Sequence, residues 1–248
     1  MTKKSEKSSN VSVTIIYDNN PYQPGLETAW GFSCLVKNTD KTILFDTGGD
    51  GSLLLRNMKA LRIEPAELDL IFLSHMHSDH IGGFWEVIKK NHKAGVFIPG
   101  SFPESFKKES GKHGLKLFEV KHPLRLSAGV FSTGELGFEI IEQSMIVQAE
   151  RGPIVITGCA HPGIVTTVSR VKDILREDIF LLLGGFHLGG MKRHALKGVV
   201  DGLKEAGVRH IGPSHCSGDA TRELFKKEYG MFFMDVGVGR TILTEDLR

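Results

Sequence analysis

Apolar and polar residues alternate with a period of two near the start of the sequence. Such alternation is typical of half-buried strands, and it occurs at 11–17. The apolar segments 32–36 and 41–45 predict two more strands. The pattern then changes, because apolar residues recur at helical spacing over 52–61. This segment predicts a helix with Asp50 or Ser52 as its N-cap.

Beyond this helix, short apolar runs alternate with amphipathic runs. The apolar runs predict strands at 70–73, 95–98, 115–120, 129–133, 144–149, 153–157, 179–183, 209–212, 231–235 and 240–243. The amphipathic runs predict helices at 84–91, 102–109, 165–175, 196–206 and 221–229. Strands that come first and then alternate with helices favour a sheet packed against helices.

The sequence shows no Pro/Ser-rich linker and no repeat of fixed period. We therefore expect one domain over 11–248, in which the less regular stretch 100–149 is a candidate subsite insertion. Residues 1–10 are rich in Lys and Ser, which predicts a disordered tail. Hydrophobic residues make up 40% of the chain and charged residues 24%, as in ordinary globular proteins.

The overall charge gives no reason to expect nucleic acid or a membrane as the main partner. The formal net charge is +2, from 31 basic and 29 acidic residues. No apolar run is long enough to span a bilayer, and no export signal precedes the first strand. Three cysteines are too few for a disulfide framework. These features predict a cytoplasmic protein, and they leave its oligomeric state undetermined.

Three histidines and an aspartate lie within six residues, directly after the apolar run 70–73. The segment reads His75-Met76-His77-Ser78-Asp79-His80. On an extended segment His75, His77 and Asp79 would point to one side, and His80 would turn away as the strand ends. Imidazole and carboxylate groups suit zinc, iron or manganese, and packing does not explain such a density of them. The run therefore predicts a metal site.

Later strands end in the same manner. An apolar run and a turn of small residues precede each of His161, His187 and His215. If the strands run in one direction within a sheet, their carboxyl ends lie at one edge, and these histidines lie there together. Asp46 follows the strand 41–45 in the same way. It is either an acceptor that orients a ligand histidine or a helix cap or turn residue.

This ordered set resembles the metallo-β-lactamase superfamily, whose hallmark is H-x-H-x-D-H followed by single histidines at later strand ends. The resemblance extends from about Val11 to the end of the chain. It implies an α/β fold, a four-layer αβ/βα sandwich with two mixed β-sheets and metal ions at one edge. It also implies that one metal is held by His75, His77 and His161, and a second by Asp79, His80 and His215.

One position departs from that family pattern. Many members carry a metal-bridging Asp after a late strand, and Gly185 occupies that place here. The resemblance therefore does not imply a permanently bridged pair of metals. The nearby His187 could supply a ligand, bind substrate or be structural.

Further motifs resemble a narrower subgroup, the 7,8-dihydropterin-6-yl-methyl-4-(β-D-ribofuranosyl)aminobenzene-5′-phosphate synthases. They are Thr133-Gly134-Glu135, Glu142-Gln143-Ser144, Thr157-Gly158-Cys159-Ala160-His161-Pro162-Gly163 and Gly184-Gly185-Phe186-His187-Leu188. The subgroup makes a methanopterin-type cofactor, which implies a phosphorylated or pterin-like small-molecule substrate.

These residues predict a metal-dependent hydrolase or a related transferase acting on a phosphorylated or ester-like compound. One or two divalent ions, with zinc first and iron or manganese as alternatives, would lower the pKa of bound water from about 15.7 toward about 7 and so supply hydroxide. Asp79 is the predicted catalytic residue. Iron-dependent redox chemistry and a non-catalytic sensor are the alternative functions.

Several residues near these motifs allow two interpretations each. Glu135, Glu142 and Gln143 are either pocket residues or turn and cap residues. Lys192 and Arg193 suit either a substrate phosphate or solvated surface. For Cys159 and Cys216, a small buried thiol is favoured over a metal ligand.

Overall fold

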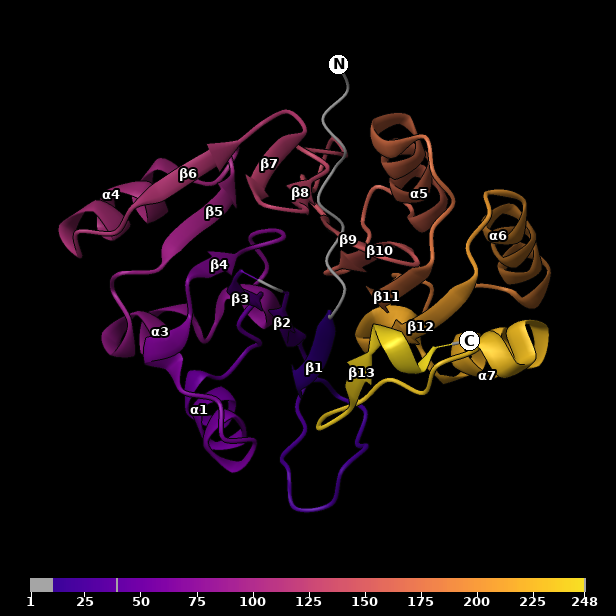
Figure 1. Ribbon diagram of the computed structural model, residues 1–248, viewed down its shortest axis with the longest axis horizontal. Helices are drawn as coiled ribbons and strands as arrows, with labels where there is room; N and C mark the ends of the chain where they lie inside the picture. Colours follow the sequence, from indigo (N-terminus) through magenta and orange to yellow (C-terminus); the bar gives the residue numbers. More distant parts are fainter. Residues whose placement is uncertain (1–10, 39, 248) are drawn as a thin grey trace.

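The structure is a computed structural model that describes residues 11–38 and 40–247. The predicted tail at 1–10 lies outside the described residues. Two mixed β-sheets face each other, and helices cover the outer face of each sheet (Figure 1). The predicted four-layer αβ/βα sandwich of the α/β class is therefore confirmed.

The first sheet has seven strands. In spatial order they are β13 (Thr241–Leu243), β1 (Ser12–Tyr17), β2 (Ser33–Lys37), β3 (Thr42–Phe45), β4 (Leu70–Phe72), β5 (Gly95–Pro99) and β6 (Leu117–Val120). The strands β3 to β6 are parallel to one another, whereas β13, β1, β2 and β3 form antiparallel pairs. The helices that follow in this half are α1 (Gly51–Ala60), α2 (Ser78–Ile81), α3 (Phe84–Lys90) and α4 (Glu104–Lys112).

The second sheet has six strands. In spatial order they are β12 (His210–Ser214), β11 (Leu181–Gly185), β10 (Gly152–Thr157), β9 (Met145–Ala149), β8 (Val130–Ser132) and β7 (Leu124–Ser127). The strands β10, β11 and β12 are parallel, and the remaining pairs are antiparallel. Its helices are α5 (Ile164–Leu175), α6 (Arg193–Glu205) and α7 (Asp219–Tyr229). The segment 100–149 contains α4 and supplies strands to both sheets.

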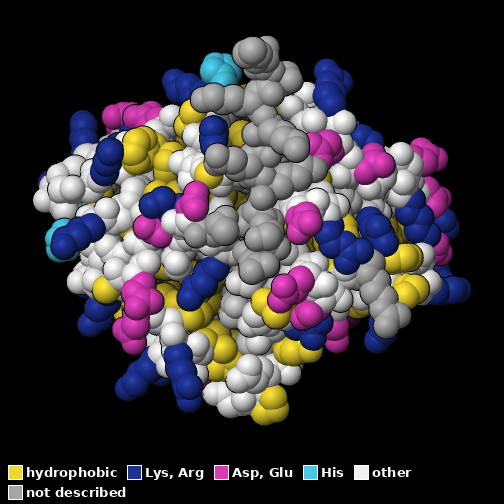
Figure 2. All heavy atoms as spheres, viewed as in Figure 1, with side chains coloured by type: hydrophobic (Ala, Val, Ile, Leu, Met, Phe, Trp, Pro, Cys, Tyr) yellow, Lys and Arg dark blue, Asp and Glu magenta, His cyan; other side chains and the backbone are white. Residues whose placement is uncertain are grey.

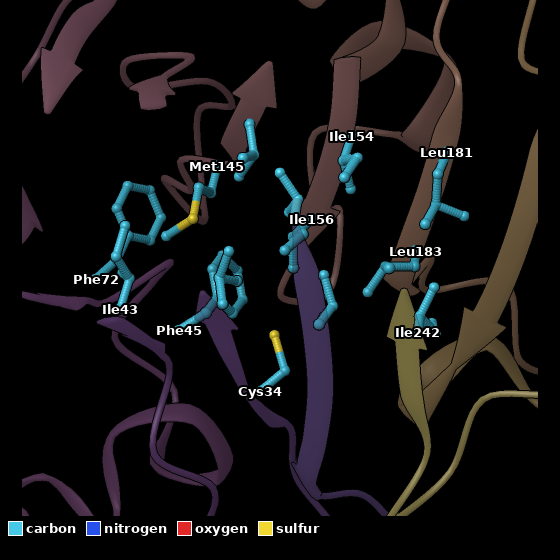
Figure 3. Packing of buried hydrophobic residues seen from close by; sticks show 14 of the residues in the cluster. Cys34, Ile43, Phe45, Phe72, Met145, Ile154, Ile156, Leu181, Leu183 and Ile242 are labelled. Carbon is cyan, nitrogen blue, oxygen red and sulfur yellow. The ribbon is translucent and has the colours of Figure 1, made fainter. Parts of the chain in front are cut away.

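Strand alternation divides the apolar side chains between three layers of core. Ile43 and Phe45 point between the sheets, whereas Leu44 packs toward the helices of the first half. Ile154 and Ile156 meet them from the second sheet (Figure 3). Because both faces of each sheet are covered, the central strands are apolar at nearly every position.

The first helix begins where the sequence predicted. Asp50 is the N-cap of α1, and its carboxylate accepts hydrogen bonds from the backbone N–H groups of Ser52 and Leu53, at 2.8 and 3.1 Å. These bonds satisfy donors that have no partner within the helix.

Three local predictions were wrong. The run after β4 is not extended throughout, because Ser78–Ile81 forms the short helix α2. The segment 231–235 is no strand: a 3₁₀ turn covers Gly230–Phe232, and only Phe233 forms an isolated bridge. The strand β7 was missed, since its residues are half-exposed or exposed and lack a clear apolar run.

The sheet register brings strand ends from both halves to one edge of the sandwich. In the first sheet Phe45 pairs with Phe72, so the residues after β3 and β4 emerge together. In the second sheet Gly185 pairs with Ser214, and Thr157 pairs with Gly184. The loops after β10, β11 and β12 therefore also emerge side by side, as parallel strands require.

Candidate metal centre

The loops after five strands meet at this edge. They carry Asp46 after β3, the His75 to His80 run after β4, Cys159 to His161 after β10, His187 after β11 and His215 after β12. The structure thus brings the predicted metal ligands, Asp46 and His187 to one edge of the sandwich.

Three ring nitrogens converge at the first part of the site. His77 Nδ1 lies 3.1 Å from His75 Nε2 and 3.2 Å from His161 Nε2. Nitrogens bound to a tetrahedral zinc at about 2.0–2.1 Å lie roughly 3.3 Å from one another. The spacing of the three nitrogens therefore fits a single ion between them.

A second group lies beside the first. Asp79 Oδ2 lies 3.2 Å from His215 Nε2 and 3.7 Å from His80 Nε2. The group also contains Cys159, whose Sγ is 3.2 Å from His80 Nε2. The close donor atoms thus form two neighbouring groups, and the second group includes a sulfur.

The turn of α2 separates Asp79 and His80 from the first group. Helical residues 79 and 80 are directed differently from the extended residues 75 and 77. Gly82 and Gly83 let this turn approach the loop after β3. A Cβ at Gly82 would lie 2.3 Å from the carbonyl oxygen of Gly49, and a Cβ at Gly83 would lie 2.3 Å from that of Thr47. The short helix, rather than strand alternation, therefore directs Asp79 to the second group.

Side-chain acceptors fix the histidine rings. Asp46 Oδ2 lies 2.7 Å from His80 Nδ1 and accepts a hydrogen bond from Ser74 Oγ at 2.6 Å. Asp46 Oδ1 accepts the backbone N–H of Ser74 at 2.7 Å. On the other side, His215 Nδ1 lies 3.0 Å from Asn19 Oδ1. Each contact leaves Nε2 of the ring directed into the site.

Glu142 holds the loop that carries Cys159 and His161. Its Oε1 accepts the N–H groups of Gly158, Cys159 and Ala160 at 2.9–3.1 Å, and its Oε2 accepts that of His161 at 2.9 Å. The carboxylate is buried, so Glu142 supports the backbone of this loop and does not line an open pocket. The sequence signal for it was only its presence in the subgroup motif.

Gln143 has a comparable structural place. Its amide nitrogen donates to the carbonyl of Leu73 at 2.9 Å, and its Oε1 accepts from Ser132 Oγ at 2.7 Å. Glu135, farther out, accepts the backbone N–H of Ser101 at 2.6 Å. Lys192 and Arg193 are exposed at the start of α6, as the surface interpretation of both predicted.

Burial and neighbouring charge set the protonation of the site. Burial, together with the charge of the surrounding histidines, lowers the pKa of His75 far below its usual range. Burial and then His187 and His77 lower the pKa of His161 to about 4. Neutral imidazole is the form that can donate a lone pair to a metal.

The acidic member of the second group is ionised. Burial opposes the charge of Asp79, but the hydrogen bond with His215 and the charge of His80 outweigh it and hold the pKa of this carboxyl below its usual range. For His80, burial lowers the pKa, and Asp46 more than reverses that effect, so the net shift is upward.

Backbone strain is concentrated in the same loops. Asp46, Ala160, His187 and His215 all have positive φ, between 48° and 58°, in the left-handed region. Residues other than glycine adopt this conformation at an energetic cost, which proteins tolerate where surrounding contacts hold the backbone in place.

The loop after β11 differs from the others. Gly185 places no side chain in the site, and His187 is exposed with its ring 4.5 Å from that of His161. A third group of close donor atoms joins His187 to Cys159 and His161. His187 therefore lies at the mouth of the site, beside the first group.

A cavity of about 570 Å³ opens next to these histidines. It is lined by His161, His187, Pro162, Thr166 and the loop Gly137–Ile140. Phe138 in that loop is 99% exposed, although it is a large apolar side chain. The cavity thus offers a hydrophobic rim directly beside the candidate metal ligands.

The family model described as the metallo-beta-lactamase superfamily matches residues 31–170, more than half of the chain. The chain belongs to the metallo-β-lactamase superfamily. The fold of that superfamily implies divalent metal ions, and the donor groups described above suit them.

Curated and solved relatives extend the similarity over nearly the whole chain. A 7,8-dihydropterin-6-methyl-4-(beta-D-ribofuranosyl)-aminobenzene-5'-phosphate synthase from Methanocaldococcus jannaschii is 27% identical, over 95% of this chain and 97% of its own length. The crystal structure of Tm1679, described as a metal-dependent hydrolase of the beta-lactamase superfamily, aligns with a TM-score of 0.78 and 24% identity, over 94% of this chain and 98% of that one. The metallo-beta-lactamase fold protein YhfI from Bacillus subtilis aligns with a TM-score of 0.71 and 17% identity, over 95% and 99%. The two structures establish the shared fold, and the synthase supports the predicted subgroup resemblance.

The surface gives two further observations. On the face shown in Figure 2, basic and acidic side chains are interspersed over most of the area. Among the described residues, no helix combines the length and apolarity needed to cross a bilayer.

Proposed function

We propose that this protein is a metal-dependent hydrolase, or a related transferase, acting on a phosphorylated or ester-like small molecule. The observation that carries the proposal is the pair of adjacent donor groups, one of three histidines and one that contains Asp79, His80 and His215. Two such groups side by side suit a two-metal site, whose ions bind and activate the attacking and leaving oxygens.

We assign His75, His77 and His161 to the first ion and Asp79, His80 and His215 to the second. Zinc is the metal we favour, because imidazole and carboxylate at these spacings fit its tetrahedral geometry. Bound metal would supply a Lewis acid and lower the pKa of water at the site.

The chain's own residues then position the reactants. Asp79 is the catalytic residue we propose, since its ionised carboxylate faces both His80 and His215 and can orient an attacking water. Asp46 orients His80 and so acts as a positioning residue. The cavity beside His161 and His187 would hold the substrate.

Two observations support a substrate class. The synthase relative carries a dihydropterin and a phosphate in its name. The exposed ring of Phe138 at the cavity rim suits stacking against a planar heteroaromatic group. We therefore propose a pterin-like or otherwise phosphorylated substrate, with the loop Gly137–Ile140 of the segment 100–149 as its subsite.

We also propose that the protein acts in the cytoplasm as a single domain over 11–248. All three cysteines are free, and Sγ of Cys159 and Sγ of Cys216 lie 3.3 Å apart without a bond. Unpaired neighbouring thiols suit a reducing compartment.

The test is metal analysis of protein purified without added metal, combined with activity on phosphodiester, phosphomonoester and ester panels. We expect one or two transition-metal ions per chain and turnover that His77→Ala abolishes. His194→Ala, which removes an exposed histidine on α6, is the matched control. Absence of metal together with unchanged activity of His77→Ala would refute the proposal.

A further inference from the structure

The space beside Gly185 is filled, not vacant. A Cβ at this position would lie 2.3 Å from the carbonyl oxygen of Gly158 and 2.8 Å from Cys216 Sγ. No side chain therefore fits at 185 without displacing the loop after β10 or the sulfur. A carboxylate has no room to enter the site from this strand.

A sulfur belongs to the second donor group instead. Cys159 belongs both to the group of Asp79, His80 and His215 and to the group of His161 and His187, with all donor atoms of each group within 4.8 Å of one another. Its Sγ is 3.2 Å from His80 Nε2. The edge between a sulfur at about 2.3 Å and a nitrogen at about 2.0–2.1 Å from a tetrahedral zinc is roughly 3.5 Å, close to this distance.

Two contacts hold that sulfur in place. Glu142 accepts the backbone N–H of Cys159 at 3.0 Å and fixes the loop. Cys216 Sγ lies 3.3 Å from Cys159 Sγ and packs against it.

We propose that Cys159 is a ligand of the second metal ion and replaces the carboxylate that Gly185 excludes, an inference that rests on the proposed function. The S–H bond breaks as the sulfur–metal bond forms, and the proton is released to solvent. Cys216 is a positioning residue that packs against the bound sulfur. A thiolate at this place favours zinc over harder ions such as manganese.

The test is X-ray absorption of the full chain loaded with zinc under reducing conditions. We expect a sulfur shell at about 2.3 Å in addition to nitrogen and oxygen at about 2.0–2.1 Å. The shell should be lost in Cys159→Ser and kept in Cys216→Ser. Cobalt-loaded protein should show a sulfur-to-cobalt charge-transfer band with the same dependence on the two variants.

The affinity of the second ion gives an independent readout. We expect its dissociation constant to rise at least about tenfold in Cys159→Ser. Loss of a residue that only hydrogen-bonds to a metal ligand already costs about this much, so loss of a ligand should cost no less. If Cys159→Ser fails to fold, a sulfur shell present in both wild type and Cys216→Ser still identifies Cys159 as the ligand. The third cysteine, Cys34, is buried between the sheets and cannot supply that sulfur (Figure 3).

The outcomes separate this inference from the proposed function. Two bound ions with no sulfur shell, or a shell that persists in Cys159→Ser, overturn the role of Cys159 alone. Protein that binds no transition metal overturns the proposed function as well.

Discussion

Asp46 Oδ2 and His80 Nδ1 lie 2.7 Å apart, and both side chains are fully buried. The two residues follow neighbouring parallel strands, so the sheet itself delivers the acceptor to the ring. Because Nδ1 is engaged by Asp46, Nε2 is the nitrogen of His80 that faces the second donor group.

Asp46→Asn should weaken metal binding about 10- to 100-fold, because the ring of His80 loses its charged acceptor while the side-chain volume is kept. Chelator competition measures this effect. Asp50→Asn is the matched control: it changes the α1 cap in the same chemical way and should leave metal affinity unaltered. Equal affinities of Asp46→Asn and wild type would contradict the assigned role of Asp46.

Glu142→Gln should lower the free energy of unfolding by about 1–3 kcal/mol, since an amide N–H₂ would face backbone N–H groups in a buried place. Urea titration of the metal-free protein measures the loss. Glu135→Gln, which alters a carboxylate with a single backbone contact at the periphery, should have a much smaller effect. If the two variants are equally stable, Glu142 does not stabilise the loop that carries Cys159 and His161.

The metal-free protein should lose stability as the pH falls from about 6.5 toward 4. The pKa of His161 is lowered in the folded state to about 4 from an ordinary 6.5. Between these values the unfolded chain binds a proton that the folded chain does not, so its population grows at lower pH. The stabilisation is fully present above pH 6.5.

Urea titrations at several pH values test this prediction. The slope of unfolding free energy against pH should be smaller in His161→Gln than in wild type. The difference should correspond to at most one proton, since the other titrating groups contribute equally to both proteins. Identical slopes would show that His161 titrates normally.

Gly185→Ala should lower the free energy of unfolding by about 1–3 kcal/mol through overpacking, because its Cβ would meet the carbonyl oxygen of Gly158. Gly198→Ala on α6 is the matched control, since nothing lies within 4 Å of its Cβ. That substitution should stabilise the helix by about 0.5–1 kcal/mol. Thermal and urea unfolding measure both changes, and a neutral Gly185→Ala would mean that the loop yields easily.

Phe138→Ala should raise KM about 2- to 10-fold for an aromatic substrate and leave kcat nearly unchanged, as expected for loss of one stacking contact. Its stability should match that of wild type, because the ring is almost wholly exposed. Met231→Ala, another exposed apolar residue far along the chain, serves as the control. An unchanged KM would remove Phe138 from the subsite.

The sequence by itself determined most of the sandwich. The apolar run at 41–45 was confirmed as a strand because both faces of this strand are covered, and the cap at Asp50 was confirmed because capping is local. The prediction of 231–235 as a strand was wrong, since an apolar run does not reveal whether a neighbouring strand is available to pair with it.

The set of donor residues was also visible in the sequence, because strand ends of parallel sheets meet at one edge. Only the tertiary structure decided how they are grouped. The short helix Ser78–Ile81 directs Asp79 away from His75, and the parallel pairing of β10, β11 and β12 brings Cys159, Gly185 and Cys216 together from distant segments. Side-chain periodicity is a local property of the backbone, whereas contacts between loops depend on sheet register and on which atoms already fill the space.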